Sequence, residues 1–234
     1  QYDGYVESFT ENWEKLERYD NNAPKTMNAH LHVLEAYTLL YQCWKDNGLK
    51  KRLEFCVDLF MNRIYDPSRR HFNLFFDNEW NSLVEMDSYG HDVETGWLLC
   101  EAARTLENQD LIEQTNQLAL DVTEACLAEG MSDKGYMIYE KKGDRKTKHA
   151  SWWGQIETVI ACVNAWQISG SDVYLQSVDT VWTFVKDHMV DKEYGEWYSD
   201  CFDGEPKKEA PKVSMWRCPY HTVRLGVEMY NRLK

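Results

Sequence analysis

The feature that most constrains the fold is an internal repeat of about 60 residues. Its clearest copies are the aromatic segments YVESFTENWEKL (5–16) and FNLFFDNEWNSL (72–83), which align without gaps and share a Phe, a Trp and a Leu position. Looser copies occur at GYMIYEKKGD (135–144) and GEWYSDCFDG (195–204). Their aromatic and turn-forming residues predict short β-hairpins. A hairpin that recurs at this period is typical of a helical toroid or a solenoid, in which each unit packs on its neighbours.

The segments between the hairpins predict pairs of helices. Residues 28–44 are apolar on nearly every side, which predicts a buried inner helix. Residues 50–65 carry one apolar stripe and charges elsewhere, which predicts an outer helix at the surface. The same order of inner and outer helix recurs at 91–107 with 110–129 and at 151–169 with 172–190, before a last inner helix at about 220–233.

The starts of the inner helices indicate how many units the chain holds. They lie near residues 28, 91, 152 and 221, so the spacings are 63, 61 and 69 residues and the chain holds roughly three and a half units. We predict an all-α fold, an α/α toroid with short β-hairpins between helix pairs, in a single domain over residues 1–234. Because neither end resembles a polar solenoid cap, we expect the chain to be part of a larger toroid or to associate to complete one. A compact bundle that needs no further sequence is the alternative.

The composition argues against several classes of protein. The formal net charge of −13 disfavours nucleic acid and anionic membranes as partners, because both bind clusters of Lys and Arg. No apolar run reaches the roughly 18 residues of a transmembrane helix. The seven cysteines include no CxxC pair, so we expect free thiols in a reducing, cytoplasmic environment. The sequence contains no HExxH motif, glycine-rich phosphate loop or GxSxG elbow.

Polar and aromatic residues gather at the start of every inner helix. In a toroid, helix N-termini of one direction face one end, so these groups are expected to converge on one cavity. A single histidine near a helix start is more often structural, and we interpret His30, which points to another face from His32, in that way. The recurrence at equivalent repeat positions favours a site. The candidates are Asn28 and His32, then His91, Glu94 and Trp97, then Trp152, Trp153 and Glu157, and finally Trp216 and His221.

Histidines, carboxylates and tryptophans in one cavity favour proton transfer on a sugar. Imidazole takes up or releases a proton near neutral pH, and aromatic rings stack on ligands. Epimerisation beside a carbonyl needs a base on one face of the carbon and an acid on the other, which two histidines from different helices can supply. A glycosidase is the alternative, because Glu94 and Glu157 could provide the two carboxylates that it needs.

Four separated motifs carry a family resemblance over essentially the whole chain. They are NAPKTMNAHLHVLEAYTLLY (22–41), GHDVETGWLLCEAA (90–103), WWGQIETV (152–159) and WRCPYHTVRLGVEM (216–229). In this order they resemble the cellobiose 2-epimerases of the N-acylglucosamine 2-epimerase superfamily. The resemblance implies an (α/α)6 barrel, of which this chain would be a C-terminal portion. It also implies an isomerase that inverts C2 of the reducing-end sugar of a β-1,4-linked disaccharide, converting cellobiose to glucosyl-mannose.

The resemblance further implies the roles of the polar residues. His91 and His221 would be the catalytic pair, one removing the C2 proton of the open-chain sugar and the other returning a proton to the opposite face. The intermediate would be a cis-enediol(ate). His32, a third catalytic residue, would hold the reacting sugar and assist ring opening together with Asn28.

The remaining candidates would support this chemistry. By the same resemblance, Glu94 and Glu157 would orient and tune the histidines, and Trp152, Trp153 and Trp216 would stack on the sugar rings. No metal or nucleotide cofactor is implied. The alternatives are an aldose–ketose isomerase of the same superfamily and an inactive, truncated fragment that binds sugar.

The family's chain is longer than this sequence. It has about six units, so the resemblance implies that about 150 residues are absent on the N-terminal side. That part would close the barrel and supply an Arg and a Tyr to the pocket. We therefore expect the 234-residue chain alone to expose apolar helix flanks, to be weakly active or inactive, and to be able to associate through its open edge.

Overall fold

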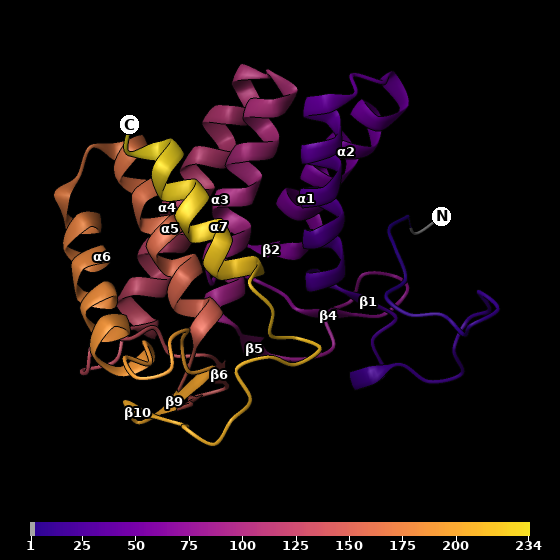
Figure 1. The fold of residues 1–234 in the computed structure, drawn as a ribbon. Helices are drawn as coiled ribbons and strands as arrows, with labels where there is room; N and C mark the ends of the chain where they lie inside the picture. The colour runs from indigo at the N-terminus through magenta and orange to yellow at the C-terminus, as the bar shows by residue number, and fades with distance from the viewer. Residues whose placement is uncertain (1–2) are drawn as a thin grey trace. The chain divides into compact units, whose positions relative to one another are not determined.

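The computed structural model describes residues 3–234, which form two compact units. Unit 1 comprises Gln1–Asp87 and Leu98–Thr115, and unit 2 comprises Ser88–Trp97 and Asn116–Lys234. The single-domain organisation expected from the sequence stays a prediction. Over the described residues, seven α-helices are joined by very short strands and loops, as Figure 1 shows. The helices are α1 (Met27–Cys43), α2 (Asn47–Leu59), α3 (Tyr89–Leu106), α4 (Gln109–Gly130), α5 (Trp152–Ser169), α6 (Asp172–Phe184) and α7 (Tyr220–Arg232).

The helix starts follow local signals in the sequence. The side-chain oxygen of Thr26 accepts a hydrogen bond from the backbone N–H of Ala29 at 3.1 Å and caps α1. Oδ1 of Asp46 caps α2 by accepting from the N–H groups of Gly48 and Leu49 at 2.8 and 2.9 Å. Such caps satisfy N–H groups that the first helical turn leaves unpaired. All seven observed starts lie within three residues of the expected ones.

Two of the outer helices, α2 and α6, end in a π-turn that the sequence does not predict. The turns are Phe60–Ile64 after α2 and Val185–Met189 after α6. In each, the next residue donates its backbone N–H to the carbonyl five residues back. The expected spans 50–65 and 172–190 included these turns as ordinary helix, because one wider turn barely alters the pattern of apolar residues.

The hairpins carry the internal repeat in their backbone conformation. Isolated β-bridges close turns of the same length at Phe9–Lys15, Phe76–Ser82 and Met131–Met137. The residue four positions after the start of each turn has a positive φ, which residues other than glycine rarely adopt. These residues are Trp13 (φ 62°), Trp80 (φ 73°) and Gly135 (φ 87°). The predicted repeat is thereby confirmed. Because both glycine and tryptophan occur at this position with a positive φ, the geometry of the turn, and not the residue type, dictates the backbone conformation there.

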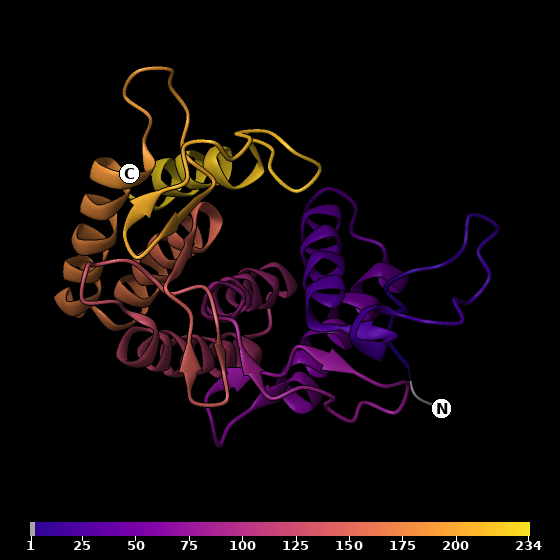
Figure 2. The ribbon, with the colours of Figure 1, turned by 90° about the horizontal axis from the view of Figure 1, so that it is seen from below.

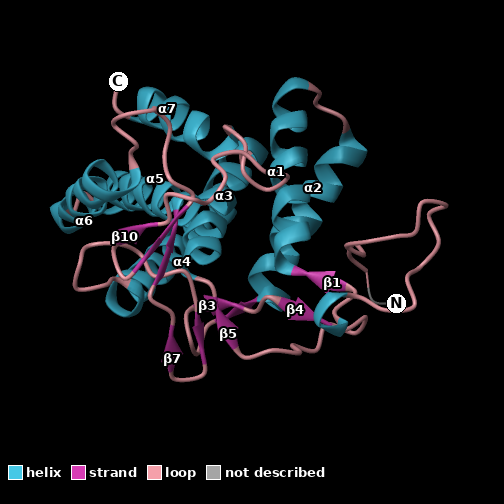
Figure 3. Ribbon diagram, turned by 60° about the horizontal axis from the view of Figure 1, so that its bottom comes forward, coloured by secondary structure: helices cyan, strands magenta, loops and turns pink. Residues whose placement is uncertain are grey.

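Short strands join the helix pairs within each unit (Figure 3). In unit 1, β1 (Lys25–Thr26) pairs antiparallel with β4 (Phe75–Phe76), and β2 (Tyr65–Asp66) pairs with β3 (His71–Phe72). In unit 2, β6 (Lys141–Lys142) pairs with β7 (Arg145–Lys146), and β9 (Asp200–Phe202) lies between β8 (His149–Ser151) and β10 (Glu205–Pro206). The remaining strand is β5 (Met86–Asp87). Because β8 leads directly into α5, the sheet of β8 to β10 positions the start of that helix.

The core of unit 1 lies between α1, α2 and the hairpin that follows them. Leu31, Leu34, Leu53, Phe60 and Phe72 are fully buried there. Burying a side chain of this size stabilises a fold by about 1.5–3 kcal/mol, so these five side chains contribute strongly to the stability of unit 1.

The expectation that the helix over 28–44 is buried on all sides is wrong for one face of α1. Leu39 and Leu40 are 57% and 44% exposed. An apolar face is buried only where another element covers it, and no part of residues 3–234 covers this one. Val223 and Val227 of α7 are likewise 59% and 50% exposed. The prediction that inner helices expose apolar flanks is therefore confirmed.

Unit 2 is organised around α5. Figure 2, seen from below, shows α5, α6 and α7 packed together in the orange-to-yellow part of the chain. Every residue of α5 from 154 to 165 is buried, as expected of an inner helix. Ser151 caps its start by accepting from N of Gly154 at 3.2 Å, and Gly170 ends it with a φ of 71°. This buried helix carries Trp153 and Glu157 into the candidate site.

His30 is a structural residue, as expected from its position relative to His32. It is fully buried, with Nδ1 2.7 Å from the carbonyl oxygen of Thr26. Its Nε2 accepts the backbone N–H of Tyr5 at 2.9 Å. Nδ1 therefore donates and the ring is neutral. Burial lowers the pKa of His30 below its usual value.

Unit 1 should lose stability as the pH falls below about 6.5, the pKa of an unfolded histidine. Because the folded pKa is lower, the unfolded chain takes up the proton first, so the contribution of neutral His30 is complete above this pH and is lost below it. The loss reaches about 1.4 kcal/mol per pH unit. Urea unfolding of the wild type and His30→Gln at about pH 7 and pH 5.5 measures it. The variant should show a smaller pH dependence, and equal dependence in both would contradict the assignment.

Two expectations from the composition concern cysteines and membranes. All seven cysteines lie in the described part of the chain, and none of them forms a disulfide bond, as expected. No helix in residues 3–234 combines the length and the apolar character that crossing a bilayer requires.

Candidate active site

A buried ionic cluster joins α3, α5 and α7 within unit 2. Its members are Glu94, Glu157 and Arg224, which are 1%, 0% and 9% exposed. Nη1 of Arg224 donates to Oε1 of Glu94 at 2.7 Å and to Oε1 of Glu157 at 3.1 Å. Buried carboxylates need such a partner, because removing a charge from water without compensation is costly. The bonded residues lie 130 and 67 positions apart in the sequence, so tertiary structure alone brings them together.

His221 extends this cluster toward the solvent. Its side chain is 15% exposed, and its Nδ1 lies 2.7 Å from Oε1 of Glu157. The other oxygen of Glu157, Oε2, accepts the indole N–H of Trp97 at 2.9 Å. A carboxylate at Nδ1 holds the imidazole in one orientation and one tautomer. Proton exchange between His221 and a ligand would therefore use Nε2.

His91 stands in the first turn of α3 and has a different partner at the same ring nitrogen. Its Nδ1 is 2.8 Å from Oγ of Ser88, which immediately precedes the helix and is 3% exposed. This buried hydroxyl orients the imidazole from the helix start. His91 and His221 thus both have Nδ1 engaged by a protein side chain, although the chemical type of the partner differs.

The ring of Trp153 contacts both imidazoles. Its centroid lies 4.5 Å from that of His91 and 5.7 Å from that of His221, and it stacks on the latter at an interplanar angle of 29°. Gly90 permits this approach, because a Cβ at that position would lie 2.7 Å from the Trp153 ring. Both histidines and Trp153 are partly exposed, whereas the ionic cluster beside them is buried. The arrangement therefore presents two imidazoles and an indole to a ligand.

Trp152 and Trp216 occupy different environments. Trp152 is 9% exposed, and the guanidinium of Arg217 lies 4.7 Å from its ring centroid. Trp216 is 77% exposed in the loop before α7. Arg217 anchors that loop through a 3.0 Å hydrogen bond to Oε1 of Glu196. The assignment of both tryptophans to sugar stacking stays a prediction.

Asn28 and His32 belong to unit 1, in the first two turns of α1. Asn28 is partly buried and His32 is exposed, and Nδ1 of His32 lies 3.2 Å from Oε2 of Glu35. Their expected contact with the reacting sugar stays a prediction. The structure thus brings together seven of the ten candidate residues in unit 2, with Trp216 on a loop of the same unit. Those seven are His91, Glu94, Trp97, Trp152, Trp153, Glu157 and His221.

The sequence analysis missed two residues that hold the glutamates and histidines in place. One is Arg224, which pairs with both Glu94 and Glu157. The sequence feature that could have identified Arg224 is its position three residues after His221, which places both side chains on the same face of one helix. Ser88 was also missed, because a serine before a helix normally indicates only an N-cap.

The ionic cluster also has donor atoms of the type that bind metals. One ligand atom each from Glu94, Glu157 and His221 lie within 4.8 Å of one another. The guanidinium of Arg224 already places a positive charge against both carboxylates. A metal ion at this point would have to displace it, so the residues fit an internal ion pair better than a metal site.

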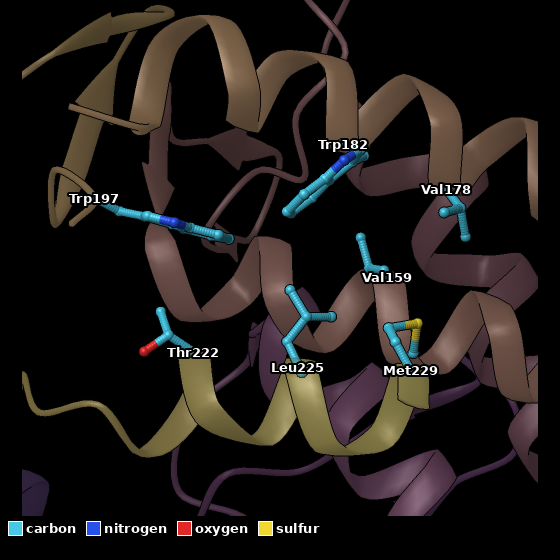
Figure 4. Close-up of a pocket in the computed structure, with 8 residues that line it drawn as sticks. Val159, Val178, Trp182, Trp197, Thr222, Leu225 and Met229 are labelled. Atoms are coloured by element: carbon cyan, nitrogen blue, oxygen red, sulfur yellow. The ribbon is translucent and has the colours of Figure 1, made fainter. Parts of the chain in front are cut away.

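A separate apolar pocket of about 440 Å³ lies between α5, α6 and α7 (Figure 4). Trp182 and Trp197 line it next to each other in a tilted ring contact, with centroids 5.9 Å apart. The lining contains no ionisable side chain, so it lacks groups for proton transfer. The lining residues are Val159, Val178, Trp182, Trp197, Thr222, Leu225, Gly226 and Met229.

Comparison with known proteins decides the family. The N-acylglucosamine 2-epimerase family (GlcNAc 2-epimerase) matches residues 1–224. The chain belongs to this family. The cellobiose 2-epimerase of Bacteroides fragilis is 40% identical over 97% of this chain and 59% of its own length. That of Dictyoglomus turgidum is 36% identical over 98% of this chain and 60% of its own length. This chain therefore spans about 60% of the length of these relatives.

Solved structures of the epimerase family have the same fold. A sugar epimerase from a ruminal bacterium matches with a TM-score of 0.93 and 34% identity over 98% of this chain and 60% of that one. The cellobiose 2-epimerase of Bacillus thermoamylovorans matches with a TM-score of 0.91 and 34% identity over 96% of this chain and 59% of that one. The predicted resemblance and the predicted fold class, part of an α/α barrel, are confirmed.

Proposed function

We propose that the full-length protein is an epimerase that inverts C2 of the reducing-end sugar of a β-1,4-linked disaccharide, with cellobiose as the expected substrate. The names of the relatives support the substrate class. The observation that carries the proposal is the pair of partly exposed imidazoles, His91 and His221, in contact with one indole ring. Two titratable groups of matched chemistry suit a reaction that removes and returns the same kind of proton.

The reaction would proceed on the open-chain sugar, in which C1 is an aldehyde. Nε2 of one imidazole takes the proton from C2, the C–H electron pair forms the C1–C2 double bond, and the carbonyl π electrons move to O1. The product of this step is a cis-enediolate. The other imidazole, already protonated, gives its proton to C2 from the opposite face while the aldehyde re-forms. Proton exchange with water then restores both histidines to their starting states.

The surrounding residues would hold these groups in place. Glu157 fixes the tautomer of His221, and Ser88 fixes the orientation of His91. Trp153 would support the sugar ring between them through stacking. We assign ring opening to His32 with Asn28. Glu94 would help to orient the two histidines.

The remaining tryptophans, Trp152 and Trp216, would contact the sugar rings by stacking. We propose that the exposed Trp216 covers a bound disaccharide from the loop before α7, while Trp152 supports His221, whose ring centroid is 6.2 Å away.

The test is incubation of the full-length protein with cellobiose in heavy water. We expect glucosyl-mannose as the product, with deuterium at C2 of the reducing-end unit, because the abstracted proton exchanges with solvent. A ketose product would identify an aldose–ketose isomerase instead, and free monosaccharide would identify a hydrolase. Calorimetric binding without any product would identify an inactive sugar-binding protein.

A further inference from the structure

Arg224 is the residue through which the second turns of three inner helices, α3, α5 and α7, are connected. It lies one turn after His221 on α7 and bonds to Glu94, one turn after His91 on α3. It also bonds to Glu157, one turn after Trp153 on α5. The guanidinium lies 4.1 Å from the ring centroid of Tyr220 and 5.3 Å from that of Trp97. The aromatic rings and the two carboxylates thus hold it from several sides.

Arg224 allows both carboxylates of this cluster to be ionised. Without it, Glu94 and Glu157 would be two carboxylates buried side by side, and such pairs hold a proton between them instead of ionising fully. A protonated Glu157 would be a poorer acceptor for Nδ1–H of His221. The groups that face this position are Glu94 on α3, Glu157 on α5, and Tyr220 and His221 on α7.

We propose that Arg224 is a positioning residue for His221. By balancing the charge of Glu94, it keeps the Glu157 carboxylate ionised and aimed at Nδ1 of the imidazole, so that Nε2 faces the substrate. Arg224 is 9% exposed, and its role is exerted through Glu157, not through contact with the sugar. The expected effect on kinetics rests on the proposed function. The tautomer and orientation of the His221 imidazole can be measured without any activity.

The kinetic test compares Arg224→Met and Arg224→Lys in the full-length protein. In Arg224→Met, kcat for C2 exchange should fall about 10- to 100-fold, as expected for the loss of charged hydrogen bonds, while KM changes by less than about threefold. The acidic limb of the pH–rate profile should move to higher pH. Arg224→Lys restores the charge and should recover part of kcat. A large rise in KM with unchanged kcat would overturn the proposal, because it would place Arg224 in contact with substrate.

A charge-balance test separates positioning from simple packing. The double variant Arg224→Met/Glu94→Gln removes the cation together with the second carboxylate, so Glu157 can ionise again. Its pH–rate profile should return toward that of Glu94→Gln alone. A double variant whose profile stays like that of Arg224→Met would overturn the charge-balance role. Thermal unfolding of each variant confirms that it is folded.

Nuclear magnetic resonance provides the readout that does not depend on activity. The imidazole nitrogens of His221 report the tautomer, and the indole N–H of Trp97, which donates to Glu157 at 2.9 Å, reports the carboxylate. Both signals should shift in Arg224→Met and return in the double variant. Unchanged signals would overturn the proposal. If the wild type exchanges no C2 hydrogen in any disaccharide, the proposed function fails, but these signals still decide whether Arg224 positions His221.

Discussion

In the full-length protein, replacing His91 or His221 by Asn should lower the rate of C2 hydrogen exchange by about 10²- to 10⁴-fold in each case, the range that general acid–base catalysis contributes. Asparagine retains an amide that can satisfy the partner at Nδ1, Ser88 or Glu157, but it cannot carry a proton at the position of Nε2. Both substitutions should be severe, because the proposed mechanism places one imidazole on each face of C2. Deuterium incorporation from heavy water measures the effect directly.

His188→Asn is a matched control for this experiment. His188 is an exposed histidine of the same unit and stacks on Phe184 with ring centroids 4.8 Å apart. Its replacement should leave exchange within about twofold of the wild type, since surface substitutions away from a site rarely matter. If His91→Asn or His221→Asn kept more than about a tenth of the wild-type rate, that imidazole would not be a proton carrier.

Replacing Glu157 by Ala should have the largest effect on stability among the site residues. The side chain is fully buried and accepts hydrogen bonds from Trp97, His221 and Arg224. Its removal leaves these donors without an acceptor and opens a cavity. We expect the free energy of unfolding to fall by about 2–5 kcal/mol and C2 exchange to be lost. Urea unfolding and the exchange assay measure the two effects.

Glu157→Gln separates the structural and chemical parts of this effect. Glutamine has nearly the same shape and still accepts hydrogen bonds through one oxygen, so the loss of stability should be less than half that of the alanine variant. Exchange should stay low, because the neutral amide does not hold the His221 imidazole as a carboxylate does. Wild-type exchange in Glu157→Gln would contradict the role assigned to the carboxylate.

Helix positions were largely predictable because their signals are local. The apolar period, an N-cap such as Ser151 and a C-terminal glycine such as Gly170 each act within a few residues of the helix. The extent to which α1 is buried could not be predicted, because an apolar face such as that of Leu39 and Leu40 does not reveal whether another segment covers it. The π-turns at Phe60–Ile64 and Val185–Met189 were missed because they preserve the apolar pattern.

The grouping of the candidate residues in unit 2 was predictable to a comparable degree. Because the repeat places His91, Trp153 and His221 at equivalent helix starts, the sequence could identify them as one group. It could not distinguish the two buried glutamates, which are chemically identical and both sit one turn after a site residue. The structure assigns Glu157 to His221 and gives Glu94 and Glu157 a common partner in Arg224.

By itself, the sequence determined the repeat, the inner and outer helices, and the four helix starts that carry polar and aromatic residues, since each depends on neighbours in the chain. Only the tertiary structure decided which charges meet. The His221–Glu157 and Arg224–Glu94 contacts join residues 64 and 130 positions apart. Such contacts depend on how helices pack against each other, and buried charges are stable only where that packing supplies a partner.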